Sequence, residues 1–107
     1  MATSNIKKPD ATMPKTRYVG NVYWWGNTWE CPADGFLVVR MTMNTSGAAA
    51  YWYVKDDTRN AQIANLTYPK ADGTTASTMV PVQKDHVYST SAQSAVQYAY
   101  ADYYEFY

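Results

Sequence analysis

The sequence is poor in the residues from which catalytic sites and covalent cross-links are built. Its 107 residues include one cysteine, one histidine and two glutamates, and none of them has a partner at a recognisable spacing. The single cysteine, Cys31, excludes an internal disulfide and a cysteine cluster for metal, and it is typical of a protein made in a reducing compartment. Because acids, bases and nucleophiles are scarce, we expect no enzymatic activity, no cofactor and no bound metal ion.

Net charge and long apolar runs are also missing. Nine basic and nine acidic residues cancel, so neither nucleic acid nor an anionic membrane is an expected partner. No apolar run reaches the roughly 20 residues of a membrane span, and the N-terminus lacks the apolar core of a signal peptide. The sequence therefore predicts a soluble chain that is neither inserted in a membrane nor secreted by that route.

Tyrosine and tryptophan are abundant instead, with eleven and four copies against two phenylalanines. Both side chains carry a polar group on a large apolar body, which suits β-strands and surfaces that contact another molecule. At this length the chain forms one domain. Residues 1–16 hold two prolines and three lysines with almost no apolar periodicity, so we expect a flexible arm or linker there and a folded domain at 17–107.

The longest apolar alternation follows a turn at Pro32 to Gly35. Leu37, Val39 and Met41 point to one side of the predicted strand and form a core face that extends to Met43. The residues at the alternate positions are apolar at the start of the strand and polar towards its end. This pattern predicts a central strand at Phe36 to Met43 that is covered on both sides near its start.

Shorter alternating segments, separated by turn residues, predict the other strands at 18–25, 48–55, 61–68, 77–82, 86–88 and 95–107. We expect 48–55 to form a hairpin with the central strand. Pro81 is expected at a sheet edge or a bulge, and the last strand is expected to bulge near 101–103. A helix over 92–101 is an alternative for that region. Six to eight short strands predict an all-β fold, an antiparallel β-sandwich of the jelly-roll kind.

Three segments stand out by their order and spacing. They are Cys31 to Val39 (CPADGFLVV), Met79 to Asp85 (MVPVQKD) and Tyr104 to Tyr107 (YEFY). Together they resemble patterns in the small β-sandwich head domains at the tips of bacteriophage tail fibres and of related receptor-binding or baseplate proteins. The resemblance covers roughly residues 28–107.

This resemblance implies a non-enzymatic virion protein, made in the bacterial cytoplasm, that is a homotrimer. The head domain would recognise a host-surface glycan or protein, and the arm would join other virion proteins. The excess of tyrosine in the last strand also predicts a homo-oligomer, since the leftover aromatic surface needs a partner. Two other roles stay open: a structural decoration or adaptor protein of the virion without a ligand, and a free-standing carbohydrate-binding module.

The polar loop at 56–60 is the predicted recognition surface. Sugar rings stack on aromatic faces while Asp, Asn and Arg side chains bind the hydroxyls, and this loop directly follows two tyrosines. The predicted ligand-binding residues are Tyr51, Tyr53, Asp56, Asp57, Arg59, Trp24 and Trp25. A core or subunit-interface position is the alternative for each tryptophan. Alternate loops of a sandwich share an end, so 83–85 is expected beside this loop. His86 is expected to be a surface residue at a strand start.

Overall fold

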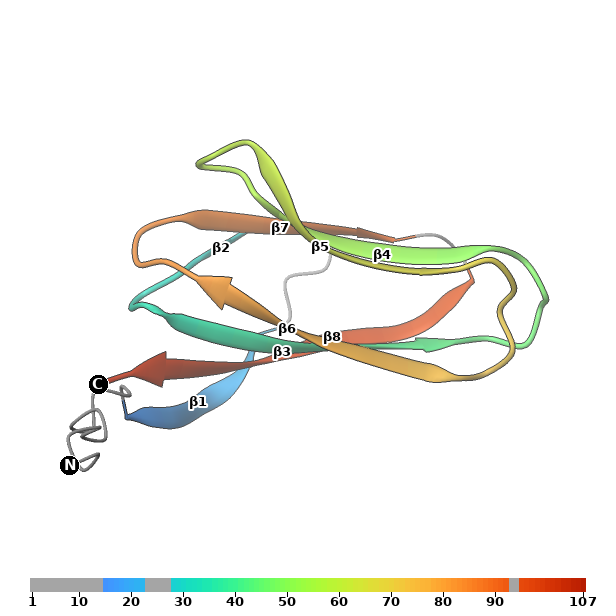
Figure 1. The fold of residues 1–107 in the computed structure, drawn as a ribbon, viewed down its shortest axis with the longest axis horizontal. Coiled ribbons are helices and arrows are strands. Elements are labelled where there is room, and N and C mark those ends of the chain that lie inside the picture. Colours follow the sequence, from blue (N-terminus) through green and yellow to red (C-terminus); the bar gives the residue numbers. More distant parts are fainter. Residues whose placement is uncertain (1–14, 23–27, 93–94) are drawn as a thin grey trace, which may run out of the picture.

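The computed structural model describes residues 15–22, 28–92 and 95–107, which form two four-stranded antiparallel sheets (Figure 1). The strands are β1 (Thr16–Val22), β2 (Thr28–Glu30), β3 (Gly35–Met43), β4 (Ala50–Asp56), β5 (Ala61–Tyr68), β6 (Thr75–Val82), β7 (Val87–Ala92) and β8 (Val96–Phe106). The first sheet has the order β1-β8-β3-β6 and the second has the order β2-β7-β4-β5. This is the strand order of an eight-stranded jelly roll. The predicted all-β antiparallel sandwich is confirmed.

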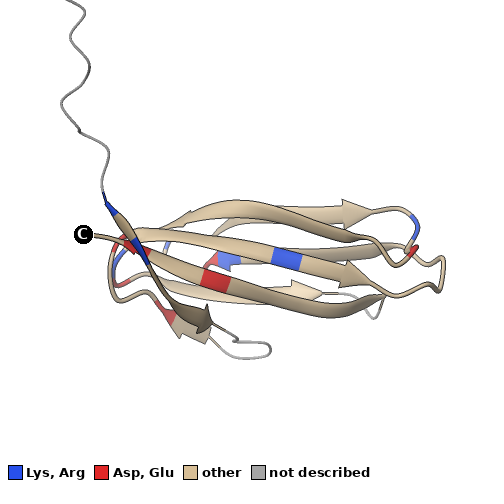
Figure 2. Ribbon diagram, turned by 90° about the horizontal axis from the view of Figure 1, so that it is seen from below, with Lys and Arg blue, Asp and Glu red and all other residues tan. Residues whose placement is uncertain are grey.

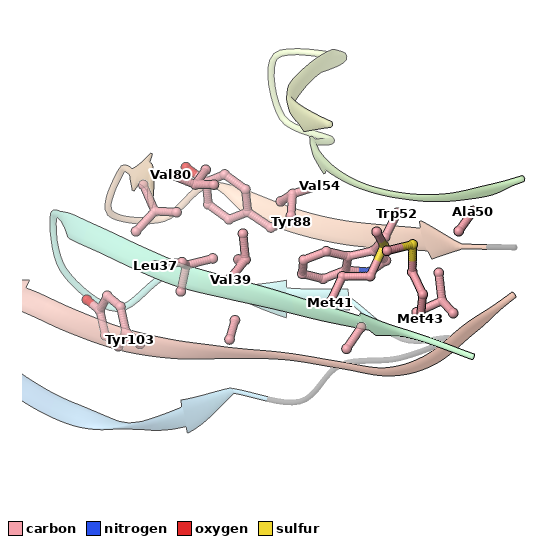
Figure 3. Packing of buried hydrophobic residues seen from close by; sticks show 14 of the residues in the cluster. Leu37, Val39, Met41, Met43, Ala50, Trp52, Val54, Val80, Tyr88 and Tyr103 are labelled. Atoms are coloured by element: carbon pink, nitrogen blue, oxygen red, sulfur yellow. The ribbon is translucent and has the colours of Figure 1, made fainter. Parts of the chain in front are cut away.

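The core lies between the two sheets and is built on the predicted face of β3. Leu37, Val39 and Met41 have no exposed surface, because strict alternation sends every second side chain of the strand inward. The facing side chains on β4 include Trp52 and Val54, and Figure 3 shows Met41 beside Trp52 in the space between the layers.

The predicted hairpin between β3 and β4 is wrong. β3 pairs with β6 and β8 in the first sheet, whereas β4 pairs with β5 and β7 in the second. The connection between them therefore crosses from one layer to the other (Figure 1). The inner face of β3 is wholly apolar and that of β4 is apolar from Ala50 to Val54, and these two faces are buried by packing against each other across the sandwich.

The last strand, β8, is a strand throughout its length and not a helix, but its bulge is not where the sequence predicted. The pairing with β3 shifts between Thr42 and Met43, opposite Gln97, rather than at 101–103. From that point on, Ala99, Ala101 and Tyr103 are buried. The larger side chains that alternate with these three lie mostly on the outer surface. The inner face of β8 in this part is therefore built largely from small side chains.

Two edge features complete the sheets. Pro81 lies on β6, an edge strand of the first sheet, as its missing N–H donor predicts. The short strand β2 was not predicted. It pairs with β7, and its Trp29 side chain packs edge-on against Tyr103 with 5.0 Å between ring centroids.

One end of the sandwich, here called the terminal end, gathers the start of β1, the C-terminus and the connections that follow β2, β4 and β6 (Figure 1). The amide of Tyr107 donates to the carbonyl of Lys15 at 2.9 Å, and the amide of Asp85 donates to the carbonyl of Cys31 at 2.8 Å. The turn at 57–60 lies here too, since the amide of Asp57 donates to the carbonyl of Val87. The predicted sharing of an end by 56–60 and 83–85 is confirmed. Most of the predicted arm, residues 1–14, lies outside the described residues, and Thr16 already belongs to β1.

Candidate functional site

The outer faces of the two sheets differ in character. Among the described residues, every large apolar side chain that is exposed belongs to the first sheet or follows it directly. These are Tyr18, Val19, Met79, Tyr98, Phe106 and Tyr107. The second sheet instead presents two half-buried tyrosines among hydroxyl and amide side chains. The molecule therefore offers two chemically distinct contact surfaces.

The outer surface of the second sheet is here called the tyrosine face. Tyr51 and Tyr53 occupy alternate positions of β4, and their rings are nearly parallel, with 13° between planes and 6.2 Å between centroids. This spacing is close to the advance of a strand over two residues, about 6.6 to 6.8 Å. Lys55 continues the same row, because it is the next outward position of β4.

A row of polar side chains on β5 runs beside the tyrosine row. Thr67 is paired with Tyr51, and Asn65 with Tyr53. The Thr67 hydroxyl donates to the Asn65 amide oxygen, and Nδ2 of Asn65 donates to Oε1 of Gln62 at 3.4 Å. The amide of Asn65 is therefore held in one orientation. On the other side of β4, β7 contributes the hydroxyls of Ser89 and Ser91. Aromatic rings flanked by oriented polar groups are a combination that binds sugars.

The structure places Asp56, one of the predicted ligand-binding residues, in the interior, where its side chain has no exposed surface. Its Oδ2 accepts hydrogen bonds from Nε of Arg59 at 2.9 Å and from Nδ1 of His86 at 2.8 Å, while Oδ1 accepts one from the backbone amide of Arg59. Burial acts to raise the pKa of this carboxyl, but the hydrogen bonds outweigh it and the pKa is lowered. Asp56 thus stays ionised and supports the turn from inside.

Asp57 lies on the outer side at the end of the tyrosine face. Its Oδ1 accepts a hydrogen bond from the Ser89 hydroxyl at 2.9 Å, and the Thr58 hydroxyl accepts one from the backbone amide of Val87. The Arg59 side chain is about half exposed. The turn at 57–60 is consequently fixed to β7 by side-chain and backbone hydrogen bonds, and Asn60 closes it with a positive φ of 54°.

The seven predicted ligand-binding residues thus have different positions. Tyr51, Tyr53 and Asp57 share the tyrosine face, Arg59 lies in the turn beside it, and Asp56 is enclosed. Trp24 and Trp25 lie outside the described residues. The polar partners on β5 and β7 were not predicted, because their register with β4 depends on the fold. The spacing within β5 itself, Gln62, Asn65 and Thr67, carries no strong signal.

His86 is partly enclosed, in contrast to the expected surface position. Its side chain is 22% exposed, Nδ1 donates to Asp56, and its ring lies over Tyr88 with 6.5 Å between centroids. The turn preceding β7 brings it there. The rule that alternate loops share an end placed 83–85 near the turn at 57–60, and extending it by one residue would have found this contact.

The outer surface of the first sheet is here called the aromatic face. Phe36 and Tyr104 stack with 4.9 Å between centroids and 8° between planes, while Tyr18 contacts Tyr104 and Phe106 contacts Phe36. Figure 2 looks onto this sheet and shows few charged segments along the strands. One exception is Arg40, which pairs with Asp102 at 2.8 Å and lies over the ring of Tyr100. Charges on this face are therefore balanced within it.

Comparison of the chain with protein-family models, with curated proteins and with solved structures gave no match. In residues 15–22, 28–92 and 95–107, no helix is long and apolar enough to cross a membrane. Within the same residues, no three His, Cys, Asp or Glu side chains are grouped as metal ligands.

Proposed function

We propose that this chain is a non-enzymatic head domain of a phage receptor-binding or baseplate protein, which recognises a host-surface glycan through the tyrosine face. The observation that carries the proposal is the near-parallel pair of Tyr51 and Tyr53 beside the hydrogen-bonded row of Thr67, Asn65 and Gln62. The rings provide stacking surfaces, and the amides and hydroxyls provide donors and acceptors for sugar hydroxyls. The resemblance of three sequence segments to phage head domains supports the virion location.

In this proposal the recognition surface is the face of the second sheet, and Asp57 and Arg59 form its border. Lys15 and the turn at 57–60 share the terminal end. If residues 1–14 join the domain to the virion, that end points toward the particle and is the less accessible one. The tyrosine face lies on the side of the domain and stays accessible in that arrangement.

The proposal includes a homotrimer formed through the aromatic face. Six large apolar side chains are exposed on or next to the first sheet, and the ion pair Arg40–Asp102 leaves the face without net charge at that position. A neutral apolar surface suits contact with copies of itself. A trimer would also present three tyrosine faces, so that weak individual sites gain in avidity.

A titration of monovalent oligosaccharides, taken from hits on a glycan array, tests the glycan site. Replacing both Tyr51 and Tyr53 by Ala is expected to weaken binding about fivefold or more, since each aromatic contact contributes about 0.5 to 1.5 kcal/mol. The variant Asp57→Ala with Arg59→Ala is expected to weaken binding less. Tyr98→Ala, which removes an exposed tyrosine from the opposite sheet, is the matched control and is expected to bind normally.

A structural virion component, such as a decoration or adaptor protein, is the second candidate, and the exposed aromatic face favours it. A protein that assembles into particles but binds neither the array nor host cells would establish this second role. If the protein binds glycan and both sets of substitutions leave its affinity and melting temperature unchanged, the proposed site would move to Trp24 and Trp25. Binding as an isolated single-domain protein, without particle assembly, would fit a free-standing carbohydrate-binding module.

A further inference from the structure

Lys55 is a cation on the tyrosine face that has no ion pair among the described residues. The arginines of the two sheets and of the turn each have an acidic partner: Arg17 with Glu105, Arg40 with Asp102, and Arg59 with Asp56. Lys55 is half-buried between Ser89 on β7 and Gln62 on β5. An ammonium group without a counter-charge is available to bind an anion.

The position of Lys55 in the row indicates where along β4 an anionic group would bind. It is the outward residue that follows Tyr53 along β4, so its side chain lies about one two-residue strand advance, roughly 6.6 to 6.8 Å, beyond the second ring. A chain of sugar units lying along β4 would place one unit against each tyrosine and the next over Lys55. The polar partners of that last position are the amide of Gln62 and the hydroxyl of Ser89.

We propose that the tyrosine face recognises an acidic glycan, with the carboxylate of a uronic or sialic acid unit bound by Lys55. This inference rests on the glycan-binding function proposed above and names its ligand class. The Gln62 side chain and the Ser89 hydroxyl lie on either side of Lys55, where they can bind the hydroxyls of the same unit.

No acidic side chain in the described part of the chain forms an ion pair with Lys55. Asp57 accepts the Ser89 hydroxyl at 2.9 Å and forms no ion pair with Lys55 within the described part of the chain. Asp56 is enclosed and is matched by Arg59 and His86. The cation of Lys55 is therefore available to a ligand, while Asp57 excludes a second carboxylate from the turn and so sets the direction in which an acidic chain binds.

The test compares pairs of oligosaccharides that differ only in charge. Uronic-acid and sialic-acid oligosaccharides are titrated into the full chain beside their carboxyl-reduced, neutral counterparts. We expect at least one acidic member to bind about tenfold more tightly than its reduced partner, and this preference to decline with added salt. Lys55→Gln is expected to abolish the preference without affecting the neutral partner, and Lys55→Arg to retain it. Lys70→Gln, which removes the same charge from the far end of the molecule, is the control.

The outcomes of this test distinguish a failure of the role of Lys55 from a failure of the glycan-binding function. Equal affinity for acidic and neutral partners, or an acidic preference that survives Lys55→Gln, would overturn the role of Lys55 and leave glycan binding intact. The absence of binding to every acidic and neutral member would overturn both. Melting curves of the three variants exclude a folding defect, since none of the replaced side chains belongs to the core.

Discussion

Oδ2 of Asp56 accepts a hydrogen bond from Nδ1 of His86, thirty residues further along the chain, at 2.8 Å. The same oxygen accepts one from Nε of Arg59. This one buried carboxylate therefore joins the end of β4 to the turn that precedes β7. The position of the turn beside the tyrosine face depends on it.

The stability of the domain should fall at acid pH through Asp56. Hydrogen bonds hold the pKa of Asp56 in the folded protein below its ordinary value of about 3.9, although burial opposes this. A lowered folded-state pKa contributes stability that is present above about pH 4 and is lost as the pH falls through the folded-state pKa. Melting temperatures measured across this range should decline for the native chain.

Asp56→Asn should remove this part of the acid dependence and destabilise the fold at neutral pH by about 1 to 3 kcal/mol, because hydrogen-bond donors lose their charged acceptor. Asp85→Asn is the control, since Asp85 is exposed and asparagine tolerates its positive φ of 69°. An acid decline of equal size in native and Asp56→Asn proteins would contradict this role of Asp56.

Leu37→Ala should cost about 2 to 5 kcal/mol of unfolding free energy, because Leu37 is fully buried at the centre of the first sheet's inner face. Val38→Ala, on the outer side of the same strand, should cost less because Val38 is only half-buried. Urea denaturation followed by tryptophan fluorescence gives both values. Equal losses for the two variants would contradict the assignment of inner and outer faces.

The inner face of β3 and most strand positions could be predicted because alternation is a local property of the chain. Strand partnership could not, since it depends on which apolar faces cover one another. Asp56 is a residue whose position the alternation along β4 could also have predicted. It continues the inward phase of Trp52 and Val54, so extending the predicted strand by one residue would have placed its carboxylate inside. The composition of a polar loop alone does not show which carboxylate faces the core.

The register that orients the tyrosine face could not be predicted from the sequence, for a related reason. Asn65 stands opposite Tyr53 only because β5 contains one extra residue between its pairings with Val54 and Lys55. A bulge of this kind shifts every later side chain by one position relative to the partner strand. Its location is set by packing across the sandwich, where Ile63 contacts the core.

Gly35→Ala should destabilise the domain by at least about 1 to 3 kcal/mol. A methyl group at this position would lie 2.9 Å from Cα of Glu105 and closer still to the backbone oxygen of Tyr104. The backbone of β8 cannot retreat without breaking the ladder that pairs Gly35 with Glu105. Thermal unfolding of the variant measures the loss, and an unchanged melting temperature would show that the two strands can separate at this point.

Light scattering at micromolar concentration should show a trimer of about 36 kDa, three times the chain mass of 12.1 kDa. Met79→Lys should shift the protein toward monomer, because it places a charge on the aromatic face at a side chain that is 64% exposed. Thr67→Lys adds the same charge to the other sheet and should leave the trimer intact. A native protein that is monomeric would refute the trimer. Equal dissociation by both variants would instead remove the aromatic face as its interface.

The pairing of the first strand with the last determines how the domain would respond to a pulling force. β1 lies antiparallel to β8 from Thr16 opposite Phe106 to Val22 opposite Ala101. A tether that pulls at Lys15 along the strand axis, while a ligand holds the second sheet, loads the hydrogen bonds of this ladder sideways and together. These hydrogen bonds then resist the force together, in shear. A pull at right angles to the strands would instead break them one after another. In the proposed arrangement, with the tether at Lys15, the domain would therefore be mechanically strongest along the axis of β1.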